Sequence, residues 1–238
     1  MSLALRVVAS ALLRRATSHR YGEHPRQVAD LHRPPGAGPH PVAVVLHGGY
    51  WQPPWTKLIM RPLCLDLARR GWAAWNVEYR RLGRDGGGWP QTFDDVAAAI
   101  DHLAELGLAG GRVVAIGHSA GGHLAAWAAS RQDARVPLTG YVSQAGVLDT
   151  KRAYELGLSD GVAEHFLAAS PIERLPAVPG LLVHGTRDDI VPLEISEAYA
   201  AASGAELAVF DEGHFGHLKP DNPMWTAVVE WLARRDEA

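Results

Sequence analysis

Short apolar runs alternate with amphipathic stretches along most of this chain. Runs rich in valine, leucine and isoleucine, bounded by glycine, proline or charged residues, predict β-strands at 42–46, 73–77, 113–116, 138–144, 180–184 and 206–210. Apolar positions at helical spacing predict helices between them, at 57–70, 93–106, 119–131, 193–203 and 224–235. Strands that alternate with helices need crossovers, so the pattern predicts an α/β protein with a doubly wound, mostly parallel sheet.

The remaining stretches are less regular. Residues 26–32 precede a Pro/Gly connector and predict an additional strand at the sheet edge. Residues 150–175 show weaker periodicity and predict one or two short helices near 163–168. That stretch is too short for a domain, so we expect a single domain over residues 23–238 without a large cap.

The N-terminal segment, residues 1–22, differs from the rest. Its first 20 residues carry four arginines and no acidic residue, and apolar positions follow a rough helical repeat, which predicts a short amphipathic helix. Arg6 interrupts the apolar stretch that a secretory signal would need. We therefore favour a docking helix over a transit peptide, which would have a similar composition.

Composition narrows the possible partners. The 238 residues include 23 Lys+Arg and 26 Asp+Glu, a net charge of −3, so we expect neither nucleic acid nor an anionic membrane as a partner. No apolar run reaches the roughly 18–20 residues of a transmembrane helix. The single cysteine, Cys64, excludes an internal disulfide and any multi-thiolate metal site, which fits a cytoplasmic protein. We expect no metal and no cofactor, and the sequence leaves open whether the chain forms a homodimer.

The most specific motif is Gly117-His118-Ser119-Ala120-Gly121, which lies directly between a predicted strand and a predicted helix. In the G-x-S-x-G arrangement a sharp turn exposes the serine at the carboxyl end of a strand. The alternative is a glycine-rich turn in which Ser119 only caps the helix. The position between strand and helix favours a nucleophile.

A serine nucleophile needs a histidine base and an acid that orients it. Asp188 and Asp189 follow the strand at 180–184, and His214 follows the strand at 206–210, in the order that this arrangement requires. We favour Asp188 over its neighbour Asp189. We also favour His214 over His217, because Gly213 places His214 at a loop apex.

An oxyanion formed in acyl transfer needs fixed hydrogen-bond donors. His47-Gly48-Gly49-Tyr50-Trp51 follows the strand at 42–46 and supplies a glycine-rich turn. We expect the backbone N–H groups of Gly49, Tyr50 and Ala120 to form the oxyanion hole.

Together these segments resemble the α/β-hydrolase superfamily, and the resemblance covers the chain from Val42 to its C-terminus. Within it, H-G-G-x-W and the G-H-S-A-G-G-H-L-A run resemble kynurenine formamidases (arylformamidases) and small carboxylesterases. The resemblance implies an α/β-hydrolase fold and hydrolysis through Ser119, Asp188 and His214. The segment at 185–192 also resembles the catalytic domains of prolyl-oligopeptidase-like peptidases.

Substrate cues come from tryptophans in loops near the predicted site. Trp51, Trp55 and Trp89 are expected either to bind an acyl or leaving group or only to pack the loops. The sequence thus predicts a serine hydrolase that cleaves a small carboxylic ester or an aryl formamide or amide. The alternatives are a small peptidase and a non-catalytic protein that uses the same fold to bind a ligand.

Overall fold

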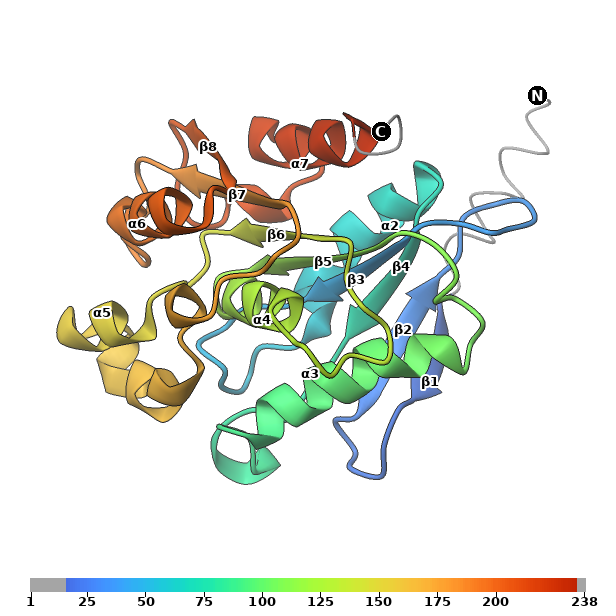
Figure 1. The fold of residues 1–238 in the computed structure, drawn as a ribbon, viewed down its shortest axis with the longest axis horizontal. Coiled ribbons are helices and arrows are strands. Elements are labelled where there is room, and N and C mark those ends of the chain that lie inside the picture. The colour runs from blue at the N-terminus through green and yellow to red at the C-terminus, as the bar shows by residue number, and fades with distance from the viewer. Residues whose placement is uncertain (1–15, 235–238) are drawn as a thin grey trace.

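The structure, a computed structural model, describes residues 16–234. In this part of the chain an eight-stranded sheet has the order β1-β2-β4-β3-β5-β6-β7-β8 (Figure 1). The neighbours from β4 to β8 are parallel, whereas β1 and β2 pair antiparallel with each other and β2 with β4. The strands are β1 (Thr17–Arg20), β2 (Val28–His32), β3 (Val42–Leu46), β4 (Ala73–Val77), β5 (Val113–His118), β6 (Gly140–Gln144), β7 (Gly180–Gly185) and β8 (Glu206–Phe210).

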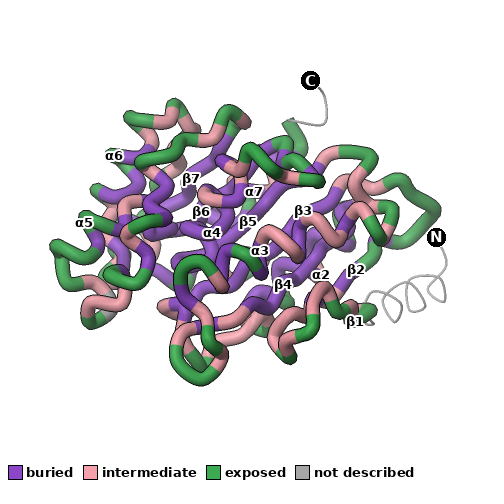
Figure 2. Tube along the Cα trace, turned by 60° about the horizontal axis from the view of Figure 1, so that its bottom comes forward, coloured by how far each residue is buried: buried purple, intermediate pink, exposed green. Residues whose placement is uncertain are grey.

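Helices cover both faces of the sheet, as the doubly wound pattern requires. Alternate side chains of each strand point to opposite faces, so Val44 and Val45 of β3 belong to different cores. The core on the Val44 side includes α3 (Gln91–Asp101), α4 (Ala120–Ala129) and α6 (Leu193–Ser203). The core on the Val45 side includes α2 (Arg61–Arg69) and α7 (Pro223–Arg234). Figure 2 shows the resulting buried centre, with exposed positions concentrated in the connections.

Shorter helices occupy the connections. The segment between β6 and β7 contains α5 (Thr150–Glu155) and the 3₁₀ segments η4 (Leu158–Ala169) and η5 (Pro171–Glu173). The remaining 3₁₀ turns are η1 (Lys57–Met60), η2 (Gly83–Asp85), η3 (His102–Ala104) and η6 (Gly216–Leu218). Within residues 16–234, none of these helices combines the length and the apolarity that a bilayer crossing needs.

The structure confirms the α/β class and corrects three local predictions. Residues 17–20 are not helical: they form β1, which pairs with β2 from Thr17 opposite Leu31 to Arg20 opposite Val28. The strand predicted at the edge, observed at Val28–His32, therefore lies between β1 and β4. Strand β6 starts at Gly140 rather than residue 138. The rest of the predicted N-terminal helix, residues 1–15, lies outside the described residues.

The carboxyl ends of parallel strands lie at the same end of the sheet, and the predicted site residues lie at this end. The loops after β3, β5, β7 and β8 carry Gly49, Ser119, Asp188 and His214 respectively. Gly49 and His214, which are 165 positions apart along the chain, are thereby brought to the same end of the sheet. The order and direction of the strands therefore bring the site residues together.

Candidate active site

Ser119 sits at a strained turn between β5 and α4. Its backbone has φ 55° and ψ −120°, a region that non-glycine residues rarely occupy. The flanking glycines permit the turn, because a Cβ at Gly117 would overlap the carbonyl group of Gly121 and one at Gly121 would overlap that of Leu46. Strain that the surrounding fold maintains is typical of functional sites. The side chain is 6% exposed at the carboxyl end of the central strand.

Asp188 is held by its own loop and faces His214. Its Oδ1 accepts hydrogen bonds from the backbone N–H groups of Ile190 and Val191, both at 2.9 Å. Its Oδ2 lies 2.7 Å from Nδ1 of His214. A carboxylate only accepts, so neutral His214 carries its proton on Nδ1 and leaves Nε2 as a base. The structure thus pairs His214 with Asp188, while Asp189 lines an outer depression with Tyr50.

The surroundings of Asp188 favour the ionised form of its side chain. Burial by itself would raise the pKa of this carboxyl, but hydrogen bonds from His184 and His214, the charge of His214 and the backbone N–H of Val191 outweigh it. The pKa of Asp188 is held well below its usual range as a result. The second neighbour, His184, donates from Nε2 to the Val191 carbonyl at 2.8 Å and accepts at Nδ1 from Ser196, at 2.7 Å.

Two further histidines lie behind His214, and the sequence had indicated no role for His118. The Nε2 atom of His118 donates to the His214 backbone carbonyl at 2.9 Å. This hydrogen bond connects the loop that carries His214 to the turn that carries Ser119. Burial and the neighbouring His214 lower the pKa of His118 to about 3, so this ring is neutral. His217 is fully buried against His118, with ring centroids 5.5 Å apart, and burial lowers its pKa as well. His217 thus lies in the packing behind the site.

The loop after β3 rests on a buried polar network that sequence reasoning also missed. His47 stacks on Tyr79 with centroids 4.3 Å apart, and the Tyr79 hydroxyl donates to the His47 carbonyl at 2.7 Å. The Nε2 atom of His47 lies 3.2 Å from Glu78 Oε1. Arg81 donates to the Trp55 carbonyl and pairs with Asp85 at 2.7 Å. The available signal was the Glu78-Tyr79-Arg80-Arg81 run directly after β4, at the same end of the sheet as the loops that carry the candidate site residues.

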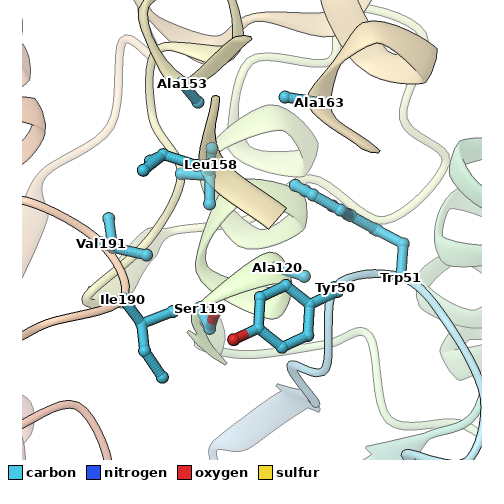
Figure 3. A pocket seen from close by; sticks show the side chains of 10 residues that line it. Tyr50, Trp51, Ser119, Ala120, Ala153, Leu158, Ala163, Ile190 and Val191 are labelled. Carbon is cyan, nitrogen blue, oxygen red and sulfur yellow. The ribbon is translucent and has the colours of Figure 1, made fainter. Parts of the chain in front are cut away.

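The three predicted tryptophans occupy different places. Trp51 is buried and lines an apolar cavity next to Ser119, where Figure 3 shows it beside Ala120 and Tyr50. Trp55 lines a second cavity, whose lining also includes both Ser119 and His214. Trp89 lines neither of these: it packs edge-on against Phe93, with centroids 4.8 Å apart, and against Trp127. Trp89 thus supports the aromatic packing around the site rather than its walls.

The three predicted oxyanion residues also meet around Ser119. Gly49 and Tyr50 line the second cavity together with Ser119 and His214, and Ala120 lines the first. The turn uses positive φ angles at Gly49, Tyr50 and Trp51, of 111°, 56° and 54°. In residues 16–234 no grouping of histidine, cysteine, aspartate or glutamate suits a metal ion. Cys64 is buried in α2, and burial raises the pKa of its thiol.

Several known proteins with esterase names are similar to this chain. The BD-FAE family model matches residues 29–155. Esterase LipC of Mycobacterium tuberculosis is 27% identical over 88% of this chain and 62% of its own length, and the probable carboxylic ester hydrolase LipM of the same organism is 27% identical over 75% and 49%. The chain thus spans about half to three-fifths of these relatives. The butyrate-bound Est2 esterase of Thermogutta terrifontis superposes with a TM-score of 0.72 at 26% identity, covering 93% of each chain.

Proposed function

Because the chain belongs to the BD-FAE family and has an α/β-hydrolase fold, we propose that it is a serine carboxylesterase acting through an acyl-enzyme. One observation carries this proposal: Ser119, on its strained elbow, shares a cavity with a histidine that Asp188 orients at 2.7 Å. Nucleophile, base and orienting acid are the three parts that this chemistry needs.

In the proposed reaction His214 Nε2 takes the proton of Ser119 as Oγ attacks the ester carbonyl. The backbone N–H groups of Gly49, Tyr50 and Ala120 stabilise the oxyanion. His214 then returns its proton to the leaving alcohol, and an acyl-enzyme remains on Ser119. Water attacks this intermediate in the second half-reaction, again with His214 as the base. Asp188 stays ionised throughout and stabilises the imidazolium.

The cavity beside Ala120 supports an acyl group larger than formyl. Its walls are apolar and come partly from the connection between β6 and β7, with Leu158, Ala153 and Ala163 facing Trp51 in Figure 3. A formamide substrate presents only a hydrogen atom on this side of its carbonyl and would leave these walls unfilled. Together with the butyrate bound to Est2, this favours esters of short alkanoic acids over the formamides that the sequence also suggested.

The test is a comparison of kcat/KM for p-nitrophenyl butanoate and for N-formylkynurenine with the purified chain. We expect the butanoate ester to be the better substrate, because only its acyl chain is long enough to contact the apolar walls beside Ala120. Preference for the formamide would contradict the carboxylesterase proposal and indicate an arylformamidase. Absence of turnover with both, and with a short peptide amide, would indicate a non-catalytic ligand-binding protein.

Replacing Gly49 should damage catalysis more than binding. In Gly49→Ala the new Cβ would overlap the Trp55 side chain, and φ of 111° is strained for alanine. The loop must shift, so we expect kcat to fall by roughly 10²–10³, the usual cost of one lost oxyanion donor. The matched control is Gly36→Ala, which has a similar φ of 104° but open space around it. A Gly49→Ala enzyme with the kcat of the control would contradict an oxyanion role for this loop.

The acid limb of the pH profile should report a single ionisation. Asp188 has a lowered pKa and remains a carboxylate, and His118 has a pKa of about 3 and remains neutral above roughly pH 4. Neither of these neighbours then titrates between pH 4 and 9, so the loss of activity toward acid pH should follow the uptake of one proton by the base. A plot of log kcat/KM against pH from 4 to 9 should have a limiting acid slope of one. A slope of two would require a second titrating group in the site.

A further inference from the structure

Two cavities meet at Ser119, and they differ in which part of the catalytic machinery they contain. The first includes Ala120 but not His214, and the second includes His214 but not Ala120. Tyr50 and Ile190 line both, so they separate the two on either side of the nucleophile. Under the proposed function the two cavities therefore receive different halves of the ester.

The proton transfer decides which half goes where. The leaving oxygen must accept its proton from His214, so the alcohol half has to extend on the His214 side of the carbonyl carbon. The acyl half then points to the other side, toward Ala120. The cavity with His214 is accordingly the leaving-group subsite.

The walls of this subsite are apolar and aromatic. Trp55, Ile59 and Phe215 line it together with Ile190, and His214 and the neutral His118 are the titratable imidazoles that reach it. No aspartate, glutamate, lysine or arginine is among its lining residues. Such walls favour the binding of an apolar ring, which leaves water on binding. They provide few hydrogen-bond partners for a polyhydroxylated alcohol.

The two aromatic walls are presented in contrasting ways. Trp55 packs directly on Gly49, and Arg81 donates a hydrogen bond to the backbone carbonyl of Trp55. The loop after β3 and this hydrogen bond therefore fix the position of Trp55. Phe215 packs edge-on against His214, with centroids 5.2 Å apart and an interplanar angle of 86°, yet 49% of it is exposed. The Phe215 ring thus has one side on His214 and the rest open to solvent, where a bound aromatic ring would contact it.

A polar alternative lies close by. An open depression beyond Tyr50 and Ile190 is lined by Gln52, Asp160 and Asp189, and a sugar alcohol would find hydrogen-bond partners there. This depression contains neither Ser119 nor His214 among its lining residues. An alcohol bound in it would lie outside the cavity from which His214 delivers the proton.

We propose that the subsite formed by Trp55, Ile59 and Phe215 binds aromatic alcohols, as leaving groups in acylation and as acyl acceptors in deacylation. The second role follows from microscopic reversibility, because the acceptor retraces the path of the leaving group. The acceptor oxygen attacks the acyl carbon and its proton passes to His214 Nε2. The bond between that carbon and Ser119 Oγ then breaks, and the proton returns to Oγ. The product is a new ester, so the protein is also an acyltransferase toward aromatic alcohols.

The first experiment compares benzyl butanoate with methyl butanoate, whose alcohols have similar acidity, so that their kcat/KM ratio reports binding of the ring. We expect the benzyl ester to be favoured roughly tenfold or more, the scale on which one apolar group is discriminated in a pocket. Phe215→Ala and Ile59→Ala should each lower this ratio several-fold. Leu158→Ala, in the acyl cavity, should change chain-length preference and leave the benzyl/methyl ratio unchanged.

The second experiment supplies p-nitrophenyl butanoate as donor with equal concentrations of benzyl alcohol and methanol, and measures both new esters. We expect benzyl butanoate to predominate, and Phe215→Ala to remove the excess. Equal use of methyl and benzyl esters, or preference for a butanoylated methyl glucoside, would overturn the aromatic subsite while leaving the esterase intact. Failure of every ester to react would instead overturn the proposed function.

Discussion

Ser119→Ala should lower kcat/KM for p-nitrophenyl butanoate by roughly 10⁴–10⁶ while the fold stays intact. The variant removes only Oγ, and the remaining oxyanion donors and binding surfaces account for the residual rate. Alanine takes a φ of 55° no more easily than serine does, so the elbow itself has no new source of strain. The measurements are steady-state kinetics, circular dichroism and labelling by a fluorophosphonate probe, which should be lost.

The matched control is Ser130→Ala. Ser130 follows the other end of α4 and donates to the Trp127 carbonyl at 2.8 Å, away from the catalytic loops. This variant should keep its labelling and stay within a few-fold of the parent rate. Near-normal turnover by Ser119→Ala would remove the serine mechanism, and an unfolded variant would be recognised by its circular dichroism.

Asp188→Asn should lower kcat by roughly 10³–10⁴. The reason lies in the hydrogen bonds around the carboxylate. Its Oδ1 position faces the N–H groups of Ile190 and Val191, which an amide nitrogen cannot serve, so the new NH₂ must face His214. It would donate to Nδ1 and move the imidazole proton to Nε2, where a base is needed. A nearly isosteric change thus produces the wrong tautomer.

The neighbouring residue provides the control for this prediction. Asp189→Asn changes the same charge one position along the chain, but Asp189 lines the open depression and is exposed. It should stay within a few-fold of the parent in kcat, although KM for polar substrates is free to change. If both variants lost activity equally, net charge rather than the His214 contact would be responsible.

Local sequence patterns predicted most of the secondary structure because each element is specified by neighbouring residues. Strands β3, β4 and β8 and helix α6 begin and end where their apolar runs do. Strand β6 starts later than expected because Pro137 precedes the run and the ladder with β5 begins only where Val114 faces Gly140. Residues 17–20 were misassigned because their pairing partner β2 supplies the hydrogen bonds, and a helical repeat in the preceding residues carries no information about it.

The candidate catalytic residues could be proposed from the chain because each follows a strand at a recognisable motif. Their supports could not. His118 donates to the His214 carbonyl across 96 positions, and Tyr79 donates to the His47 carbonyl across 32. No periodic pattern in the sequence indicates a single buried hydrogen bond of this kind, because only the folded sheet brings its two partners together.

The sequence by itself determined an α/β chain and the order serine, acid, histidine, because turn chemistry and hydrophobic periodicity are local. The tertiary structure decided which acid faces the base and which histidine it orients, since both depend on where the loops after β7 and β8 converge. It also decided that Trp51 and Trp55 line different cavities while Trp89 lines neither. A site for a substrate is a shape enclosed by several loops, and that shape exists only after the parallel strands have aligned their ends.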